Sequence, residues 1–331
     1  MIYTSKAISH PNIAIAKYWG KRDASLNLPL FDSVAFGLEG LTTQTTATWI
    51  DTPSADSLTI DDIRIPEHRI SRIKRIIDAV REMKGWDKSC EIRSQNSFAH
   101  SSGLASSASG AAAAALAISK AAGIDLPQDA LSTIARLGSG SAARSIHPGW
   151  TRWRAGSNAD GSDSYAVQIA PADHWQLDVF VVCVSSTQKA VSSTECMMRC
   201  TESPFWNTYC EEASKAADIV QTIVRDRDFT ALARAAHHNA MMLHALTLSC
   251  PEPVCYFAPQ TIQIMQKIFR MSTAIPVCCT LDAGANVIVL CENIATPFVK
   301  NEIMDLDVPF IQTQIGGGTY SDENEGFNNE K

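Results

Sequence analysis

A run of small residues, SSGLASSASGAAAAALA (101–117), limits what this chain can fold into more than any other stretch. Gly103 to Gly110 lead directly into AAAAALAISKAAG, whose alanines have the highest helix propensity. The run therefore predicts a loop that delivers unpaired backbone N–H groups to a helix N-terminus, where anions such as phosphate bind. A flexible Gly/Ser linker is the alternative, but a linker gains nothing from a stable helix at its end. The run lacks the Lys-Ser/Thr of a Walker A motif and the GxGxxG spacing of a dinucleotide fold.

Composition excludes several classes of protein. Of the 331 residues, 45% are hydrophobic and 19% charged, which is enough apolar material for a full core. The net charge is −7 and basic residues form no sustained run, so a nucleic-acid or anionic-membrane surface is not expected. No apolar run approaches the roughly 20 residues of a spanning helix. The start, MIYTSKAISHPN, lacks the apolar core of a signal peptide, so we expect a cytoplasmic protein that does not bind membranes.

The cysteines and histidines do not form a recognisable metal or disulfide pattern. None of the ten cysteines makes a CxxC pair, which favours buried free thiols. Most lie in apolar surroundings, including Cys183, Cys278, Cys279 and Cys291. The clustered histidines fall within one predicted helix, where ligand spacing argues against a metal site. They are His237, His238 and His244.

Hydrophobic patterning predicts antiparallel strands and helices that occur in separate runs. Alternation predicts a strand over 43–50, and 58–65 should turn at Asp61 and Asp62. Helical spacing predicts an amphipathic helix over 69–84 with a basic outer face, and an Ala-rich helix over 109–122. In the second half we expect long helices over 205–225 and 228–249, and a hairpin that turns at 282–286.

This order of elements predicts an α+β protein with two lobes that meet near residue 170. Residues 1–170 would form an N-terminal lobe that carries the phosphate loop, and 171–318 a C-terminal α+β lobe. The acidic and polar end, 319–331, is typical of a disordered tail.

Three further motifs contain charged residues in unusual places. Lys17 lies among apolar residues in NIAIAKYWGKR (12–22), where a lysine is costly unless it meets an anion or reaches solvent at an edge. GSGSAARS (138–145) offers hydroxyls and Arg144 at a second predicted helix start, a set that suits a carboxylate or phosphate. Helix capping is the alternative there, but it needs no arginine.

Asp282 in LDAGANVIVL stands at the end of an apolar strand. It could simply form the turn. Held near Lys17 and Arg144, it would instead stay ionised and could accept a proton or orient a hydroxyl.

In their order, these motifs resemble the diphosphomevalonate decarboxylases of the GHMP kinase superfamily. The resemblance runs from about His10 to Val289 through NIAIAKYWGKRDASLNLP, SSGLASSASG, GSGSAARS, the SST before a methionine, and LDAGANV. It implies a two-lobed GHMP-kinase-like fold with antiparallel sheets packed against helices, an active site in the cleft between the lobes, and a homodimer. It also implies ATP-dependent, Mg²⁺-assisted decarboxylation of mevalonate 5-diphosphate to isopentenyl diphosphate in isoprenoid biosynthesis.

The resemblance assigns roles to matching positions. Asp282 would act as base or orienter at the 3-hydroxyl, beside Lys17, with Asn12 near the reacting groups. Arg144 would hold the substrate carboxylate, with Ser139 and Ser141 nearby. The remaining matches concern phosphates: Tyr18, Lys21 and Ser193 at the 5-diphosphate, and Gly103, Leu104, Ala105, Ser106 and Ser107 at the ATP phosphates, with Ser106 also at Mg²⁺.

Three departures from the family pattern accompany the resemblance. Ala99-His100-Ser101-Ser102 replaces the usual Pro-Thr-Ala-Ala, Cys196 replaces a glycine near the expected diphosphate pocket, and Ala285 replaces the proline of DAGPN. The change at Cys196 leaves a phosphomevalonate decarboxylase as an alternative. A superfamily kinase that phosphorylates a mevalonate without decarboxylating it, and a non-catalytic binding module, are the others.

Overall fold

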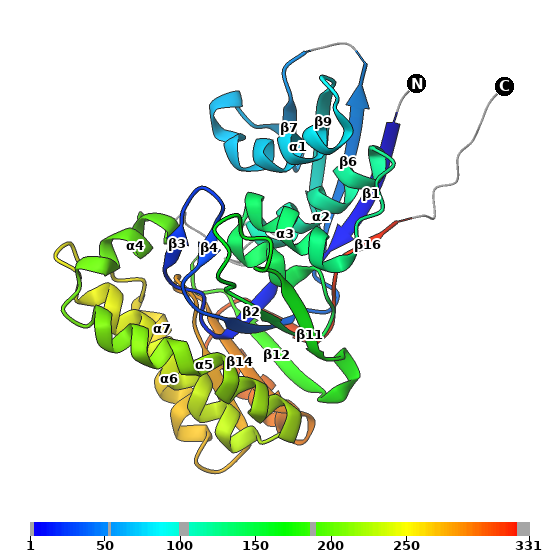
Figure 1. The fold of residues 1–331 in the computed structure, drawn as a ribbon. Coiled ribbons are helices and arrows are strands. Elements are labelled where there is room, and N and C mark those ends of the chain that lie inside the picture. The colour runs from blue at the N-terminus through cyan, green and yellow to red at the C-terminus, as the bar shows by residue number, and fades with distance from the viewer. Residues whose placement is uncertain (1–2, 52–53, 99–105, 186–189, 323–331) are drawn as a thin grey trace.

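The computed structural model shows an α+β fold of three main sheets and the helices that cover them (Figure 1). It describes residues 3–51, 54–98, 106–185 and 190–322.

A six-stranded sheet forms one end of the molecule. Its alternating strand β6 buries every second residue, as the sequence predicted. The strand order is β16 (Tyr320–Ser321), β1 (Tyr3–Ser9), β6 (Thr43–Ile50), β9 (Ser89–Asn96), β7 (Ser57–Ile60) and β8 (Ile63–Arg64). One apolar core joins this sheet to three helices. These are α1 (Ser71–Lys84), α2 (Ser106–Ala121) and α3 (Gln128–Gly138).

Two four-stranded sheets build the rest of the molecule. One has the order β11 (Ala166–Ala170), β10 (Trp150–Trp153), β5 (Ser33–Gly37) and β2 (Asn12–Ala16). The other has the order β13 (Val277–Thr280), β14 (Val287–Glu292), β12 (Leu177–Val182) and β15 (Phe310–Gln314). A two-stranded ribbon joins β3 (Lys21–Asp23) and β4 (Leu28–Pro29).

The helices of the second half lie together, away from α1 (Figure 1). They are α4 (Ser193–Arg199), α5 (Trp206–Asp226), α6 (Phe229–Leu248), α7 (Pro259–Met271) and α8 (Thr296–Met304). Short 3₁₀ segments complete the chain: η1 (Glu67–Arg69), η3 (Gly140–Ser145), η4 (Ala172–His174), η5 (Cys200–Glu202) and η6 (Asn293–Ala295).

The lobe boundary predicted near residue 170 falls between β11 and β12. One buried cluster extends across it, since Ile13 and Phe36 share that cluster with Leu177, Val220 and Leu290. The division into lobes at 170 therefore stays a prediction: each side has a core of its own, and this shared cluster joins them.

The structure refines three local predictions. Asp61 and Asp62 both adopt positive φ, at 46° and 63°, and form the turn of the β7–β8 hairpin as expected. The Ala-rich helix begins at Ser106, three residues before the predicted start. The disordered tail predicted over 319–331 is wrong for its first residues, because Tyr320 and Ser321 pair with β1; residues 323–331 lie outside the described residues.

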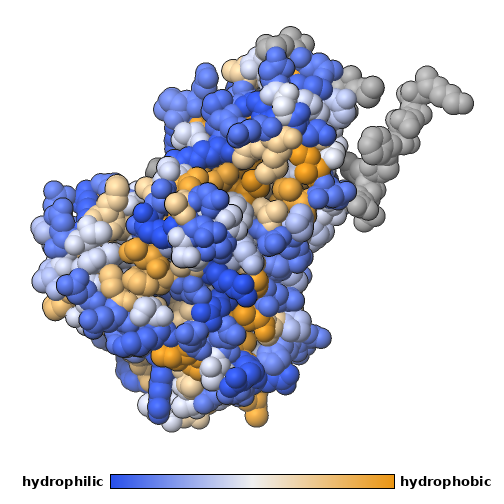
Figure 2. Space-filling model, in the orientation of Figure 1, coloured by the Kyte–Doolittle hydropathy of each residue, from blue (hydrophilic) through white to orange (hydrophobic). Residues whose placement is uncertain are grey.

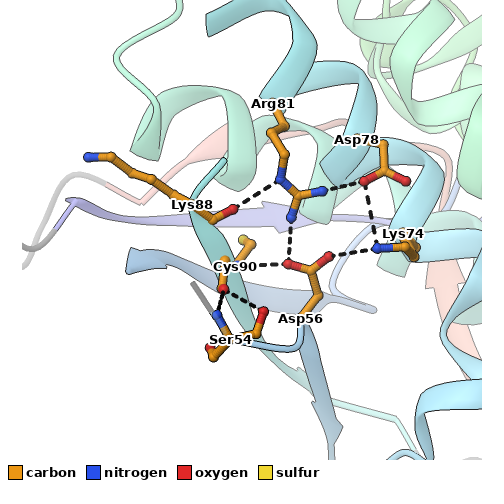
Figure 3. Close-up of polar contacts among 8 residues, drawn as sticks. Ser54, Asp56, Lys74, Asp78, Arg81, Lys88 and Cys90 are labelled. Atoms are coloured by element: carbon orange, nitrogen blue, oxygen red, sulfur yellow. Dashed lines mark hydrogen bonds and ion pairs between the residues drawn. The ribbon is translucent and has the colours of Figure 1, made fainter. Parts of the chain in front are cut away.

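A buried carboxylate fastens α1 to the edge of the six-stranded sheet (Figure 3). Asp56, just before β7, accepts hydrogen bonds from Arg81 at 2.6 Å, Lys74 at 3.2 Å and the backbone N–H of Cys90 at 2.9 Å. Arg81 also pairs with Asp78. The Asp56 carboxylate is 4% exposed, so its lone pairs are committed to the fold.

Hydrophilic residues cover most of the face seen in Figure 2, and apolar residues interrupt them in patches. Within the described ranges, no helix has both the length and the apolar character needed to cross a membrane.

Candidate active site

Lys17 and Asp282 form an ion pair between the segments that follow strands β2 and β13, which belong to two different sheets. Lys17 follows β2, and its Nζ donates to Asp282 Oδ1 at 2.8 Å and to the Ala14 carbonyl oxygen at 2.7 Å. The lysine side chain is 3% exposed, whereas the carboxylate is 48% exposed. Burial lowers the pKa of Lys17, and the carboxylate of Asp282 opposes that shift. The pair thus combines a buried cation with a carboxylate that solvent or a ligand can reach.

Arg144 lies on η3, buried beside this pair. Its Nε donates to Asn12 Oδ1 at 3.0 Å and one Nη donates to Ser33 Oγ at 2.6 Å. Burial lowers the pKa of Arg144 to about 10, while the charge of Asp282 raises it. Among the described residues, no carboxylate forms an ion pair with the guanidinium. A buried cation without an ion-pair partner is costly, and an anionic ligand would stabilise it.

Asn12 orients this guanidinium. Its amide nitrogen donates to the Ser141 carbonyl oxygen at 3.0 Å and to Ser145 Oγ at 2.8 Å, while its oxygen accepts from Arg144. Ser139 and Ser141 place their hydroxyl oxygens 3.4 Å apart, both half-buried, where α3 ends and η3 begins. The predicted second helix start is therefore a short 3₁₀ segment. Asn12 has the contacts of a residue that positions Arg144, and its predicted catalytic role stays a prediction.

Tyr18 and Lys21 line the side of the site next to α1. The Tyr18 ring packs on Trp153 at 4.7 Å between centroids, and its buried hydroxyl has no hydrogen-bond partner among the described residues. Burial raises the pKa of Tyr18. Lys21 Nζ donates to Asn27 Oδ1 at 2.7 Å. Burial, and then the charges of Arg72 and Arg75, lower the pKa of Lys21 to about 8.

Arg72 is a site residue that sequence reasoning missed. Its charge lowers the pKa of Lys21 and opposes the raised pKa of Tyr18, so it acts on the residues predicted to hold the substrate phosphates. The only signal was the basic outer face of the 69–84 helix, and nothing in the pattern singled out one of its cations. Ser33, which receives a hydrogen bond from Arg144, was missed because its stretch has only the pattern of a strand.

The predicted phosphate-binding serines stand on two helices. Ser106 and Ser107 open α2, with Ser106 half-buried and Ser107 exposed; Gly103, Leu104 and Ala105 lie outside the described residues. Ser193 opens α4, whose first turn is capped by Ser192 Oγ, which accepts from the Glu195 N–H at 3.1 Å.

Cys196 does not face solvent. Its side chain is fully buried in an apolar cluster with Trp19, Cys200 and Tyr256. The position of Cys196 therefore gives no support to the phosphomevalonate decarboxylase alternative, since the thiol is enclosed by the core.

The residues present fit a magnesium ion that arrives with a nucleotide. Within the part of the chain that the structure describes, no three His, Cys, Asp or Glu side chains could hold a metal ion together. Mg²⁺ commonly binds through substrate phosphates, waters and one or two protein oxygens, and the hydroxyls at the start of α2 offer such oxygens.

The α+β fold, which solved structures of relatives share, is of the GHMP-kinase-like class, and it brings Lys17 and Asp282 together. Models of known protein families match both halves of the chain and support this class. Residues 9–166 match a diphosphomevalonate decarboxylase-like N-terminal domain, and residues 179–315 match a mevalonate 5-diphosphate decarboxylase C-terminal domain. The chain belongs to the diphosphomevalonate decarboxylase family.

Individual relatives and solved structures support this assignment. Diphosphomevalonate decarboxylase mvd1 of Aspergillus fumigatus is 34% identical over 87% of this chain and 76% of its own. The Candida albicans enzyme is 32% identical over 87% and 84%. Among structures, the Staphylococcus aureus mevalonate diphosphate decarboxylase has a TM-score of 0.89 at 30% identity over 97% and 98%. A complex described as MDDEF with MVAPP, AMPPCP and magnesium has a TM-score of 0.90 at 31% identity, covering 97% and 99%.

Proposed function

We propose that the protein catalyses ATP-dependent decarboxylation of mevalonate 5-diphosphate to isopentenyl diphosphate, with ADP, phosphate and CO₂ as the other products. The observation that carries this proposal is the exposed Asp282 carboxylate, held by a buried lysine next to a buried arginine that has no carboxylate partner. Membership of the family supports it, since relatives carry this activity in their names.

The reaction needs a leaving group beside the carboxylate that departs. ATP with Mg²⁺ supplies the phosphoryl group that converts the 3-hydroxyl into that leaving group. Asp282 lies at the open end of the ion pair, where it can accept or orient the hydroxyl proton. Lys17 keeps Asp282 ionised and fixes its direction through the 2.8 Å hydrogen bond.

Arg144 would hold the substrate carboxylate with two parallel hydrogen bonds, as a planar guanidinium does well. Asn12 and Ser33 hold the guanidinium in place from behind. Once the leaving group is formed, loss of CO₂ supplies the electron pair of the new double bond, and no electron sink is required. The work of the protein is then positioning and charge stabilisation.

The positive cluster beside α1 suits a substrate tail with a high negative charge. Burial lowers the pKa of Lys21 most, and the charges of Arg72 and Arg75 lower it further, so these cations repel Lys21 in the free protein. A diphosphate would relieve more of that repulsion than a monophosphate. The roles of Tyr18 and Ser193 at this tail, and of Ser106 and Ser107 at ATP, are part of the same proposal.

A substrate panel tests the proposal. The purified protein is incubated with ATP, Mg²⁺ and mevalonates that carry no, one or two phosphates, and both ADP and CO₂ are measured. We expect equal amounts of ADP and CO₂ with the diphosphate. ADP without CO₂ would indicate a kinase, a preference for the monophosphate would indicate a phosphomevalonate decarboxylase, and no ADP would indicate a binding module.

We further propose that the protein is a cytoplasmic homodimer, on the family resemblance. Light scattering of the purified protein tests the dimer, and fractionation of cells that produce it tests the location.

A further inference from the structure

His244 lies behind the catalytic pair, on a helix that the mechanism does not use. It belongs to α6 and is 2% exposed. Its imidazole ring packs against Phe257 at 4.3 Å and Tyr256 at 6.2 Å between centroids. Since this histidine takes part in no metal cluster of the described residues, its burial calls for another explanation.

The imidazole is neutral, and both charges of the catalytic pair act on it. Burial, and then the charge of Lys17, lower the pKa of His244 to about 4, whereas the carboxylate and the main chain of Asp282 raise it. Nε2 is buried and, within the described part of the chain, has no partner at hydrogen-bond geometry. The ring thus lies close to the Asp282 turn with unused hydrogen-bonding capacity, which is costly in a buried group.

Helix α6, which carries His244, is hydrogen-bonded to strand β13, which leads to Asp282. Thr280, the last residue of β13, donates from Oγ1 to the Ala236 carbonyl oxygen of α6 at 3.4 Å. Any contact between His244 and the turn is therefore made between two elements that already pack together.

We propose that His244 is a positioning residue for Asp282: the neutral ring donates a hydrogen bond to the main-chain carbonyl of Asp282 that tightens when substrate binds. This inference rests on the proposed function. Hydrogen bonds in a site without substrate are often loose and become well aligned in the complex. A neutral ring suits this role, because a second positive charge would compete with Lys17 for the carboxylate.

Two variants of similar length separate a hydrogen-bonding role from a space-filling one. His244→Gln keeps an N–H donor, and His244→Met removes it. We expect His244→Met to lower kcat about thirtyfold, as one lost buried hydrogen bond would, with KM for ATP and substrate within about threefold. His244→Gln should stay within about fivefold of the wild-type kcat.

His237 provides the matched control. It lies two turns earlier on α6, and its ring packs edge-to-face on Phe269 at 4.4 Å between centroids. His237→Met should leave kcat unchanged. The wild type is first shown to release ADP and CO₂ together; absence of CO₂ there defeats the proposed function, whereas the variants test the positioning role alone.

Near-normal kcat in His244→Met, or equal losses in both His244 variants, would overturn the inference. A second measurement covers the case in which His244→Met does not fold. In ¹⁵N-histidine wild type, the ring resonance that is missing from His244→Gln should move to a hydrogen-bonded shift when mevalonate 5-diphosphate is added. A resonance that does not move would also overturn it.

Discussion

Asp56 and Asp282 are both paired with cations. In the Asp56 cluster the carboxylate is the buried group, whereas in the Asp282 pair the cation is the buried group. At Asp56 the carboxylate is 4% exposed, and its partners Lys74 and Arg81 are 53% and 19% exposed (Figure 3). At Asp282 the carboxylate is 48% exposed and Lys17 is 3% exposed. A carboxylate enclosed by three donors can take no proton from a ligand, while an exposed one held by a buried lysine can.

The difference distinguishes an ion pair that stabilises the fold from one that can do chemistry. Removal of a buried carboxylate leaves its former partners without their acceptor, and the cost falls on folding. Removal of the Asp282 charge should cost less folding free energy than removal of the Asp56 charge, since Lys17 keeps its hydrogen bond to the Ala14 carbonyl oxygen and burial lowers the pKa of Lys17. Five predictions test this contrast, the largest expected effect first.

Asp282→Asn should lower kcat by about a thousandfold or more, because an amide cannot accept the hydroxyl proton and no longer pairs with Lys17. Steady-state release of ADP and CO₂ measures the loss. ATP affinity, measured by calorimetry, should match the wild type. A variant that retains most of its turnover would contradict the role given to Asp282.

Asp56→Asn should lower the free energy of unfolding by roughly 3 kcal/mol, because Lys74, Arg81 and the Cys90 N–H lose a charged acceptor. Turnover per folded molecule should not change. Urea denaturation followed by circular dichroism measures the shift. The control is Asp78→Asn, whose exposed pairs should be worth no more than about 1 kcal/mol. Equal stability of the two variants would remove the contrast.

Arg144→Lys should lower kcat/KM about a hundredfold, equivalent to about 2.7 kcal/mol. A lysine cannot keep the hydrogen bonds to Asn12 and Ser33 and also present a planar fork to a carboxylate. Arg136→Lys is the matched control, since Arg136 is equally buried but donates to the Gly161 and Ser164 carbonyl oxygens. It should lose stability and keep its kcat/KM. Near-normal catalysis by Arg144→Lys would place the substrate carboxylate elsewhere.

Mevalonate 5-diphosphate should exceed the 5-monophosphate in kcat/KM by at least about tenfold, or about 1.4 kcal/mol. The cations beside Tyr18 gain additional charge-assisted hydrogen bonds from a second phosphate. Competition between the two substrates at saturating ATP measures the ratio. Equal or faster use of the monophosphate would make the protein a phosphomevalonate decarboxylase and leave the contrast between Asp56 and Asp282 intact.

Lys21→Arg should remove a basic limb from the pH profile of kcat/KM. With its pKa lowered to about 8, Lys21 loses its charge in the free enzyme as pH rises, so kcat/KM should fall about tenfold by pH 9. Arginine stays charged, so the variant should not show this fall. Lys6→Arg, at a half-buried pair with Asp322 on the six-stranded sheet, serves as the control. If kcat/KM of the Lys21→Arg variant still falls at the same pH, a group other than Lys21 causes the fall.

Local pattern was sufficient for the parts of the fold and site that depend on neighbouring residues. The alternation in β6, the turn at Asp61 and Asp62, and the α1 helix were confirmed because each depends on side-chain periodicity or turn chemistry over a few residues. The pairing of Lys17 with Asp282 could also be predicted, since the resemblance placed both beside the reacting group.

The parts that could not be predicted depend on contacts between distant segments. Nothing near Ser321 indicates that β16 returns to pair with β1, and β7 pairs with β9 in parallel across a helix. Local pattern also could not show that Cys196 faces inward, because a helical turn places a side chain only once its neighbours are known. The network that holds Arg144 joins Asn12 and Ser33 from separate strands.

The contrast itself is tested most directly by the double variant Asp56→Asn/Asp282→Asn, measured with both single variants for turnover per folded molecule and for free energy of unfolding. Because the two carboxylates lie beside strands of different sheets and their hydrogen-bond partners found in the described residues differ, their effects should add within about 0.5 kcal/mol. We predict that the double variant has the turnover of the Asp282→Asn single variant and the free energy of unfolding of the Asp56→Asn single variant. If Asp56→Asn abolishes turnover in folded protein, or Asp282→Asn unfolds it, the division between a structural and a catalytic ion pair is wrong.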